Sequence, residues 1–171
     1  GDAGILATAD AGLAERAAWL RQYGWRQRYV SDLVGVNSRL DELQAAILRL
    51  RLPRLAAGNA RRQAIAARYD AVLGARAPAR RAGAAHVFHQ YVLRLADRDA
   101  VQARLRAAGI GTGIHYPVPV HLQPAYAGRL PLGPRACAAT EQAAADGLSL
   151  PMFPELSEAQ IDRVCAALQT L

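Results

Sequence analysis

The first feature that could do chemistry is an asparagine placed directly before a predicted helix start. Ser38 and Asp41 match a capping box, in which an acidic residue follows a serine by three positions. A helix start presents free backbone N–H groups and partial positive charge, so it attracts phosphate. The Asn37 amide could donate to the same anion, and Arg39 in the first turn would be favoured by an anion nearby. The alternative is a plain capped helix with a solvated arginine.

The second feature is a loop, stiffened by prolines, that carries two histidines and a tyrosine. His115, Tyr116 and His121 lie in the segment 111–121, which is rich in glycine at its start and in proline after Tyr116. Stiff loops held on a scaffold are common places for binding side chains. The alternative is a structural turn whose histidines are satisfied by the backbone.

The composition excludes several classes of function. The 171 residues contain no lysine, and all 21 basic residues are arginine, so a Walker A phosphate loop is ruled out. Neither G-x-S-x-G nor H-E-x-x-H occurs. The net charge is +7, but the arginines are spread among alanines and leucines without interleaved aromatic residues, so we expect no nucleic-acid partner.

Compartment and chain extent can be read from a few further residues. No apolar run approaches the ~20 residues of a membrane helix. Cys137 and Cys165 show no metal-binding spacing, so we expect a cytoplasmic protein without a metal site. The only methionine is Met152, and the chain opens Gly1-Asp2-Ala3-Gly4. We therefore expect this chain to be a piece of a longer protein.

The first half of the chain predicts mostly helices. Residues 5–8 are typical of a short buried strand, and Asp10 is placed to cap a helix that Gly24 ends. Residues 25–37 indicate a structured loop. Apolar residues at helical spacing predict a helix from Arg39 to Pro53 and a second from 55 to 73, followed by a connection over 75–85.

The second half predicts a strand–helix–strand unit and a closing helix. The strands are expected over 86–95 and 110–116, with a helix between Asp97 and Gly109. His86 and His89 would then face opposite sides of the first strand, and both are interpreted as structural. A proline-rich loop, a helix ending near 147, an extended segment over 148–154 and a capped helix after Ser157 follow.

Three separated motifs resemble those of a known family. G-x-N-S-R-L-D-E-L-Q-A-A runs over 35–46, G-I-G-T with I-H-Y-P and H-L-Q over 109–123, and L-S-L-P-M over 148–152. Together they resemble the sugar-nucleotide aminotransferases, the DegT/DnrJ/StrS family, and the resemblance extends over essentially the whole chain. The segment 1–4 resembles the residues that follow the family's cofactor lysine.

The resemblance implies an α/β fold, the C-terminal part of an aspartate-aminotransferase-like fold. Residues 1–50 would end the large cofactor-binding domain, 51–85 would form a linking helix and connection, and 86–171 would form a small α+β domain. The family implies a pyridoxal 5'-phosphate enzyme that works as a homodimer with a shared active site. Its members transfer an amino group, usually from glutamate, to a keto sugar on a nucleoside diphosphate. The sequence H-Y-P-V-P-V-H-L-Q most resembles that of members acting on deoxythymidine-diphosphate 3-keto or 4-keto sugars.

The resemblance also assigns residues. Asn37 would reach the cofactor phosphate of the neighbouring subunit, and His115 and Tyr116 would lie near the sugar nucleotide. Further substrate-binding candidates are Arg26, Arg28, Arg39 and His121, with the arginines placed to contact the diphosphate.

No catalytic residue is assigned within these 171 residues, because the family's Schiff-base lysine is absent from them. We expect the chain alone to be catalytically incomplete and the lysine to lie upstream of Gly1. Two alternatives stay open at this point. One is a relative without the lysine that performs dehydration, and the other is a non-catalytic chain that dimerises or binds anions.

Overall fold

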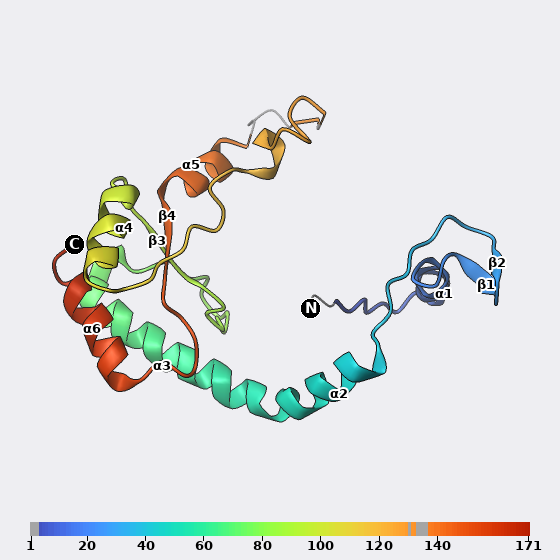
Figure 1. Cartoon of the computed structure of the whole chain (residues 1–171), viewed down its shortest axis with the longest axis horizontal. Coiled ribbons are helices and arrows are strands. Elements are labelled where there is room, and N and C mark those ends of the chain that lie inside the picture. Colours follow the sequence, from blue (N-terminus) through green and yellow to red (C-terminus); the bar gives the residue numbers. More distant parts are fainter. Residues whose placement is uncertain (1–3, 130, 133–136) are drawn as a thin grey trace. The chain divides into compact units, whose positions relative to one another are not determined.

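The computed structural model describes residues 4–129, 131–132 and 137–171, and it divides into two compact units, Gly1–Pro53 and Arg54–Leu171 (Figure 1). Both contain helices and strands, as an α/β assignment requires. The predicted division at 50 and 85 into large domain, linker and small domain stays a prediction. No helix among the described residues is both long enough and apolar enough to span a bilayer.

The first unit opens with the helix α1 (Ala11–Leu20). The predicted cap is confirmed, because the Asp10 side chain accepts a hydrogen bond from the Leu13 N–H at 3.0 Å. The helix ends at Leu20, earlier than the predicted stop at Gly24. The predicted strand over 5–8 is wrong: no strand forms there, and Ile5 is 96% exposed, because residues 5–8 pair with no other segment among the described residues.

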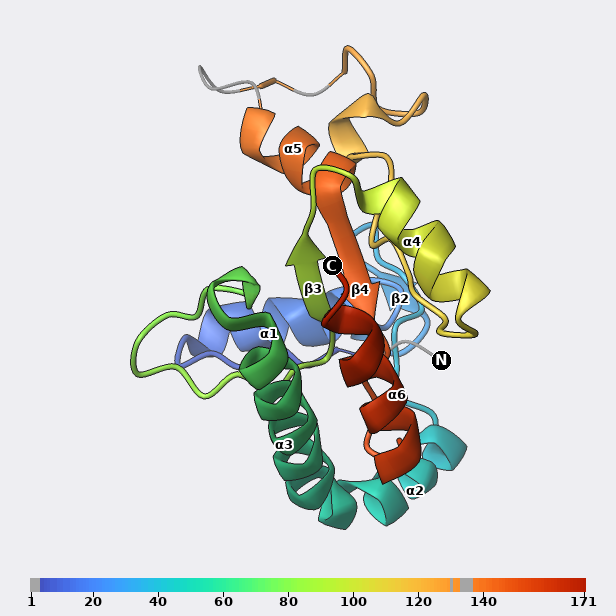
Figure 2. The same ribbon diagram turned by 90° about the vertical axis from the view of Figure 1, so that its left-hand side faces the viewer.

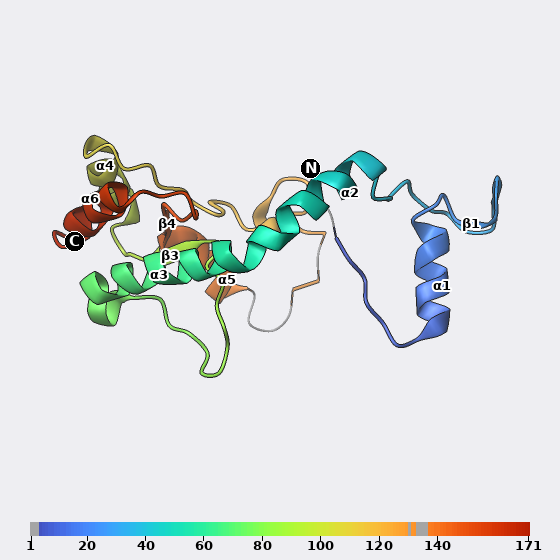
Figure 3. The ribbon, with the colours of Figure 1, turned by 90° about the horizontal axis from the view of Figure 1, so that it is seen from below.

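A small antiparallel hairpin follows, formed by β1 (Trp25–Gln27) and β2 (Val30–Ser31). It lies beside α1, as Figures 1 and 3 both show. Beyond the hairpin the chain returns along the end of α1, where an isolated bridge pairs Gln22 with Asn37. The segment predicted as a structured loop is therefore a hairpin followed by a return segment that makes a single bridge to the end of α1.

The helix α2 (Glu42–Arg51) begins later than predicted. The expected capping box at Ser38 is wrong, because Asp41 is the N-cap residue and makes no side-chain capping bond. The reason lies in the backbone: the Ser38 N–H donates to the Arg21 carbonyl at 2.9 Å, and the Val36 N–H donates to the Leu20 carbonyl at 2.8 Å. These bonds hold the chain extended through residue 38, so helical turns can start only after it.

The second unit is built on two helices that pack together, α3 (Leu55–Leu73) and α6 (Glu158–Leu168) (Figure 2). The helix α3 has the predicted bounds and follows a 3-10 turn at Leu52–Arg54, so Pro53 interrupts the helix as expected. The predicted capping box of α6 is confirmed: the Ser157 hydroxyl accepts from the Gln160 N–H, and the Gln160 side chain accepts from the Ser157 N–H.

A two-stranded antiparallel sheet joins distant parts of this unit. The strand β3 (Tyr91–Arg94) pairs with β4 (Gly147–Leu150), and the helices between them are α4 (Arg98–Ala107) and α5 (Ala138–Asp146). The predicted strand–helix–strand unit is wrong. Residues 110–116 form no strand, and their backbone is paired with the sheet at the single bridge between Gly113 and Ser149 among the described residues, because their glycines disfavour a continuous ladder.

The core of the second unit lies where α3, α4 and α6 cover this sheet. Tyr69 and Tyr91 meet edge to face at 5.3 Å, and burial raises the pKa of both phenols well above the ordinary value. The Tyr91 hydroxyl donates to Asp70 at 2.7 Å, which satisfies it in the core. The large side chains that are fully buried are Tyr69, Tyr91, Ile65, Leu93, Leu105, Leu148, Ile161, Leu168 and Val101.

Candidate functional site

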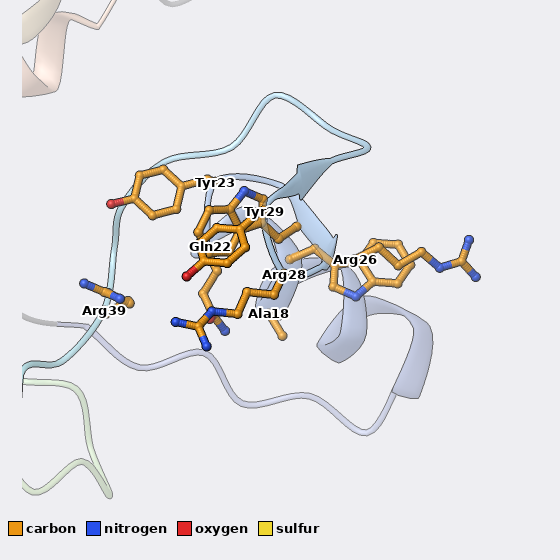
Figure 4. Close-up of a pocket in the computed structure, with 9 residues that line it drawn as sticks. Ala18, Gln22, Tyr23, Arg26, Arg28, Tyr29 and Arg39 are labelled. Atoms are coloured by element: carbon orange, nitrogen blue, oxygen red, sulfur yellow. The ribbon is translucent and has the colours of Figure 1, made fainter.

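A hollow of about 640 Å³ lies beside the hairpin in the first unit (Figure 4). It collects all three arginines that the sequence assigned to the diphosphate, although they come from the hairpin and from the segment before α2. Its lining residues are Ala18, Trp19, Gln22, Tyr23, Trp25, Arg26, Arg28, Tyr29 and Arg39. Cationic and aromatic side chains therefore dominate one concave surface.

The three arginines are not equivalent. The Arg26 guanidinium lies over the Trp19 ring, 5.2 Å from its centroid, and it extends away from the other two in Figure 4. Arg28 lies over the Tyr29 ring at 4.8 Å, with its guanidinium on the same side of the hollow as that of Arg39 in this view. Within the described residues neither Arg28 nor Arg39 pairs with a carboxylate. Both are thus free to meet an anion.

Three aromatic rings form a chain along the hairpin. Tyr23 and Trp25 lie 5.0 Å apart between centroids, and Trp25 and Tyr29 lie 5.3 Å apart in an edge-to-face arrangement. Tyr29 is 72% exposed, so packing within this unit leaves its ring accessible. Sequence reasoning singled out the arginines but missed this aromatic chain, whose signal was the closely spaced aromatic residues in 19–29.

Asn37 lies outside the residues that line the hollow, with its backbone paired to Gln22, which does line it. Its side chain is exposed. The argument from a helix start is corrected here, because α2 begins five residues later and its free N–H groups are not those next to Asn37. What remains is an exposed amide, held by a paired backbone, that can donate to an anion.

In the second unit, His115 and Tyr116 form a separate cluster on the loop after α4. The His115 Nδ1 atom lies 2.9 Å from the Ser149 hydroxyl, and its ring meets Tyr116 edge to face at 5.5 Å. Tyr116 is 74% exposed. The structure therefore brings these two predicted residues together and adds Ser149, which sequence reasoning missed; its signal is the one polar side chain in the apolar strand β4.

His121 is held differently. Its Nε2 atom lies 3.0 Å from the Glu141 carboxylate on α5, and its side chain is only 7% exposed. This contact fastens the proline-rich loop to α5. Of the predicted substrate-binding residues, His121 is the one whose ring is already covered and paired within the chain.

His86 and His89 also depart from expectation. They precede β3 and both line a second hollow of about 480 Å³, so they do not face opposite sides of a strand. The His86 Nδ1 atom accepts from the Phe88 N–H at 3.0 Å, which agrees with a structural role. Across the described residues no group of three or more His, Cys, Asp or Glu is arranged to hold a metal ion.

Comparison with known proteins decides the family. The model of the DegT/DnrJ/EryC1/StrS aminotransferase family matches residues 1–169. The chain belongs to this family. Aminotransferases of the DegT/DnrJ/EryC1/StrS family depend on pyridoxal 5'-phosphate, and their fold is the α/β aminotransferase fold that the sequence motifs indicated. The recognition from three motifs is therefore confirmed.

Relatives align with nearly all of this chain, but the alignment spans less than half of each relative's own length. "Erythromycin biosynthesis sensory transduction protein EryC1" of Saccharopolyspora erythraea is 46% identical over 99% of this chain and 47% of its own length. "dTDP-3-amino-3,4,6-trideoxy-alpha-D-glucose transaminase" of Streptomyces venezuelae is 46% identical over 99% of this chain and 45% of its own. The crystal structure of S. venezuelae DesV in complex with a ketimine intermediate superposes with a TM-score of 0.85 at 44% identity, over 95% of this chain and 45% of DesV. The chain thus spans about half the length of these family members.

Proposed function

We propose that the complete protein is a pyridoxal-phosphate-dependent aminotransferase that transfers an amino group to a keto sugar carried on a nucleoside diphosphate. These 171 residues would form its C-terminal part. The observation that carries the proposal is the hollow beside the hairpin, where Arg28 and Arg39 lie unpaired among the described residues, next to exposed aromatic rings. The names of the relatives from S. venezuelae and Acidithiobacillus ferrooxidans agree with it, since both are transaminases of nucleotide-linked amino sugars.

The two halves of a nucleoside diphosphate fit the two chemistries of this hollow. A guanidinium is planar and always charged, so it binds phosphate oxygens through two parallel hydrogen bonds. The flat faces of Trp25 and Tyr29 suit stacking with a nucleobase. Arg28 and Arg39 would therefore hold the diphosphate, and Arg26 would keep the hairpin on Trp19.

The cofactor fits this chain at one position. The exposed Asn37 amide can donate to the cofactor phosphate, and in the proposed homodimer it donates to the cofactor of the second copy. When bound, pyridoxal phosphate supplies the electron sink for moving an amino group. The lysine that binds it covalently would be supplied by sequence outside these 171 residues, which contain none.

His115 and Tyr116 would be further contacts for the sugar nucleotide, because both side chains are accessible and their loop is tied to β4. Glutamate is the proposed amino donor. The compartment would be the cytoplasm, where nucleotide sugars are made and where Cys137 and Cys165, both free thiols in this structure, stay reduced.

The test is transfer of a labelled amino group by the complete protein loaded with pyridoxal phosphate. With [15N]glutamate and dTDP- or UDP-linked 3-keto and 4-keto sugars, we expect 15N in the nucleotide sugar by mass spectrometry. The same keto sugars without a nucleotide are the control and should react far more slowly. If no nucleotide sugar takes up 15N, the proposal is wrong. A dehydrated product without the label would instead support the dehydratase alternative.

A further inference from the structure

We propose that Ser149 fixes the tautomer of His115, so that the proton of the neutral imidazole sits on Nε2 and points away from β4 as a hydrogen-bond donor. Ser149 is then a positioning residue for substrate recognition. The identity of the ligand, an oxygen atom of the nucleotide-linked sugar, rests on the proposed function, whereas the tautomer rests on the structure alone.

Ser149 is a buried polar residue in an otherwise apolar strand. Ser149 is 5% exposed and lies in the middle of β4, with apolar neighbours on either side in the strand. A buried hydroxyl that lacks a hydrogen bond costs about 1–3 kcal/mol. The His115 Nδ1 atom, 2.9 Å away, is its one side-chain or backbone partner within the described part of the chain.

The backbone holds the two residues at this distance. The Gly113 N–H donates to the Ser149 carbonyl at 3.0 Å, and the Ser149 N–H donates to the Gly113 carbonyl at 2.7 Å. This pair of bonds fixes the loop two residues before His115. A Cβ on Gly113 would stand 2.6 Å from His115 Cε1, so only glycine there leaves the ring its place beside β4.

The donors and acceptors available in the His115–Ser149 pair decide which tautomer forms. If Nδ1 carried the proton, it would donate to the Ser149 oxygen, and the hydroxyl proton would have no acceptor among the residues that the structure describes. If Nδ1 is unprotonated, the hydroxyl donates to it and every group in the pair is satisfied. The second arrangement therefore prevails, and it leaves the proton on Nε2.

The consequence is a defined chemical preference. His115 is exposed as a residue and its Nδ1 atom is occupied by Ser149, so Nε2 is the ring nitrogen left to bind a ligand. An N–H there binds oxygen acceptors such as a phosphate, carbonyl or hydroxyl oxygen, and it does not accept from donors. The imidazolium keeps the same Nε2–H, with the Ser149 hydroxyl turned to accept from Nδ1, so the outward group is a donor in both charge states.

The first experiment reads the tautomer directly. The complete protein is labelled with [15N]histidine, and the His115 signals are assigned by their loss in His115→Gln. Long-range 1H–15N correlations above the titration range are expected to show a protonated Nε2 and an unprotonated Nδ1 in the wild type. Ser149→Ala should give a mixture of tautomers, whereas Ser149→Thr, which keeps the hydroxyl, should retain the wild-type pattern. A wild-type proton on Nδ1 overturns the proposal.

The second experiment links the tautomer to the substrate. In Ser149→Ala we expect the KM for the nucleotide sugar to rise about fivefold, with kcat changed less and cofactor content unchanged. Thr112→Val is the matched control, because it removes a hydroxyl of the same loop that contacts Gln102 instead of His115. An unchanged KM in a Ser149→Ala protein whose tautomer has shifted overturns the role in binding. A wild type without any aminotransferase activity refutes the proposed function and leaves the tautomer result standing.

Discussion

Gly35 lies against Gly24 so closely that a Cβ on Gly35 would stand 2.1 Å from the Gly24 nitrogen. Gly24 is equally confined by another neighbour, since a Cβ on it would stand 1.8 Å from the Leu33 carbonyl oxygen, and Gly24 has a φ of +75°. This close approach lets the chain turn back after the hairpin and pair Asn37 with Gln22. The glycine that opens the G-x-N-S-R motif thus has a steric role in placing the residues after it.

We therefore expect Gly35→Ala to displace the return segment and open the hairpin, because backbone atoms cannot yield to the added methyl group. Limited trypsin digestion should cut faster after Arg26 and Arg28, and nucleotide-sugar binding should weaken. Gly4→Ala is the control, because a Cβ at that position meets no atom within 4 Å. Equal cleavage rates in Gly35→Ala, Gly4→Ala and the wild type would contradict the steric role.

The three arginines that line the hollow should differ in how much each contributes to nucleotide affinity. Arg28→Gln and Arg39→Gln are each expected to weaken dTDP or UDP binding to the complete protein about tenfold, the usual loss for one charge-assisted contact. Arg26→Gln should weaken it less, because Arg26 is turned toward Trp19. Isothermal titration at two salt concentrations measures this, and the loss should shrink at high salt. If Arg26→Gln binds as weakly as the other two, the assignment of ligand and support is wrong.

The sequence predicted local elements well where a single side chain decides them. The Asp10 cap, the interruption at Pro53 and the Ser157–Gln160 box follow from chemistry within one turn, and all are confirmed. The long helix α3 was also clear from its periodicity.

Pairing between distant segments could not be predicted in this way. The helix expected at Ser38 is delayed by backbone bonds to residues 20–23, which no local pattern reveals. The partner of β3 is β4, more than fifty residues away, instead of the nearby segment 110–116. The site shows the same limit: the residue types were found, but the contacts of Ser149 with His115 and of Glu141 with His121 come from tertiary structure.

The ion pair between Arg94 and Asp146 should make the free energy of unfolding depend on pH in the acidic range. Arg94 at the end of β3 binds the carboxylate at the end of α5 through two nitrogens, and these hydrogen bonds lower the pKa of Asp146. A carboxylate with a lowered folded pKa stabilises the protein above its unfolded pKa, about 3.9, and this contribution is lost as pH falls through the folded value. Asp146→Asn should therefore be less stable than the wild type at pH 7 and nearly equal to it at the lowest pH where both fold.

Urea unfolding at several pH values measures that difference. Glu155→Gln is the control, because Glu155 is exposed and makes no ion pair with any residue that the structure describes. The difference between its free energy of unfolding and that of the wild type should stay close to zero at every pH. A difference for Asp146→Asn that persists unchanged in acid would show that the carboxylate contributes through its shape and not through its charge.

Asn37 should be needed to retain the cofactor. Asn37→Ala removes one amide donor to the cofactor phosphate, so we expect retention in the complete protein to weaken by about 1–3 kcal/mol. Asn37→Asp should be worse, because a carboxylate repels the phosphate at the same position. Ser38→Ala is the neighbouring control, since Ser38 is tied to Arg21 through its backbone N–H. Pyridoxal phosphate remaining after dialysis, measured by absorbance, reports the effect; if both Asn37 variants hold as much cofactor as Ser38→Ala, the phosphate is bound by other residues.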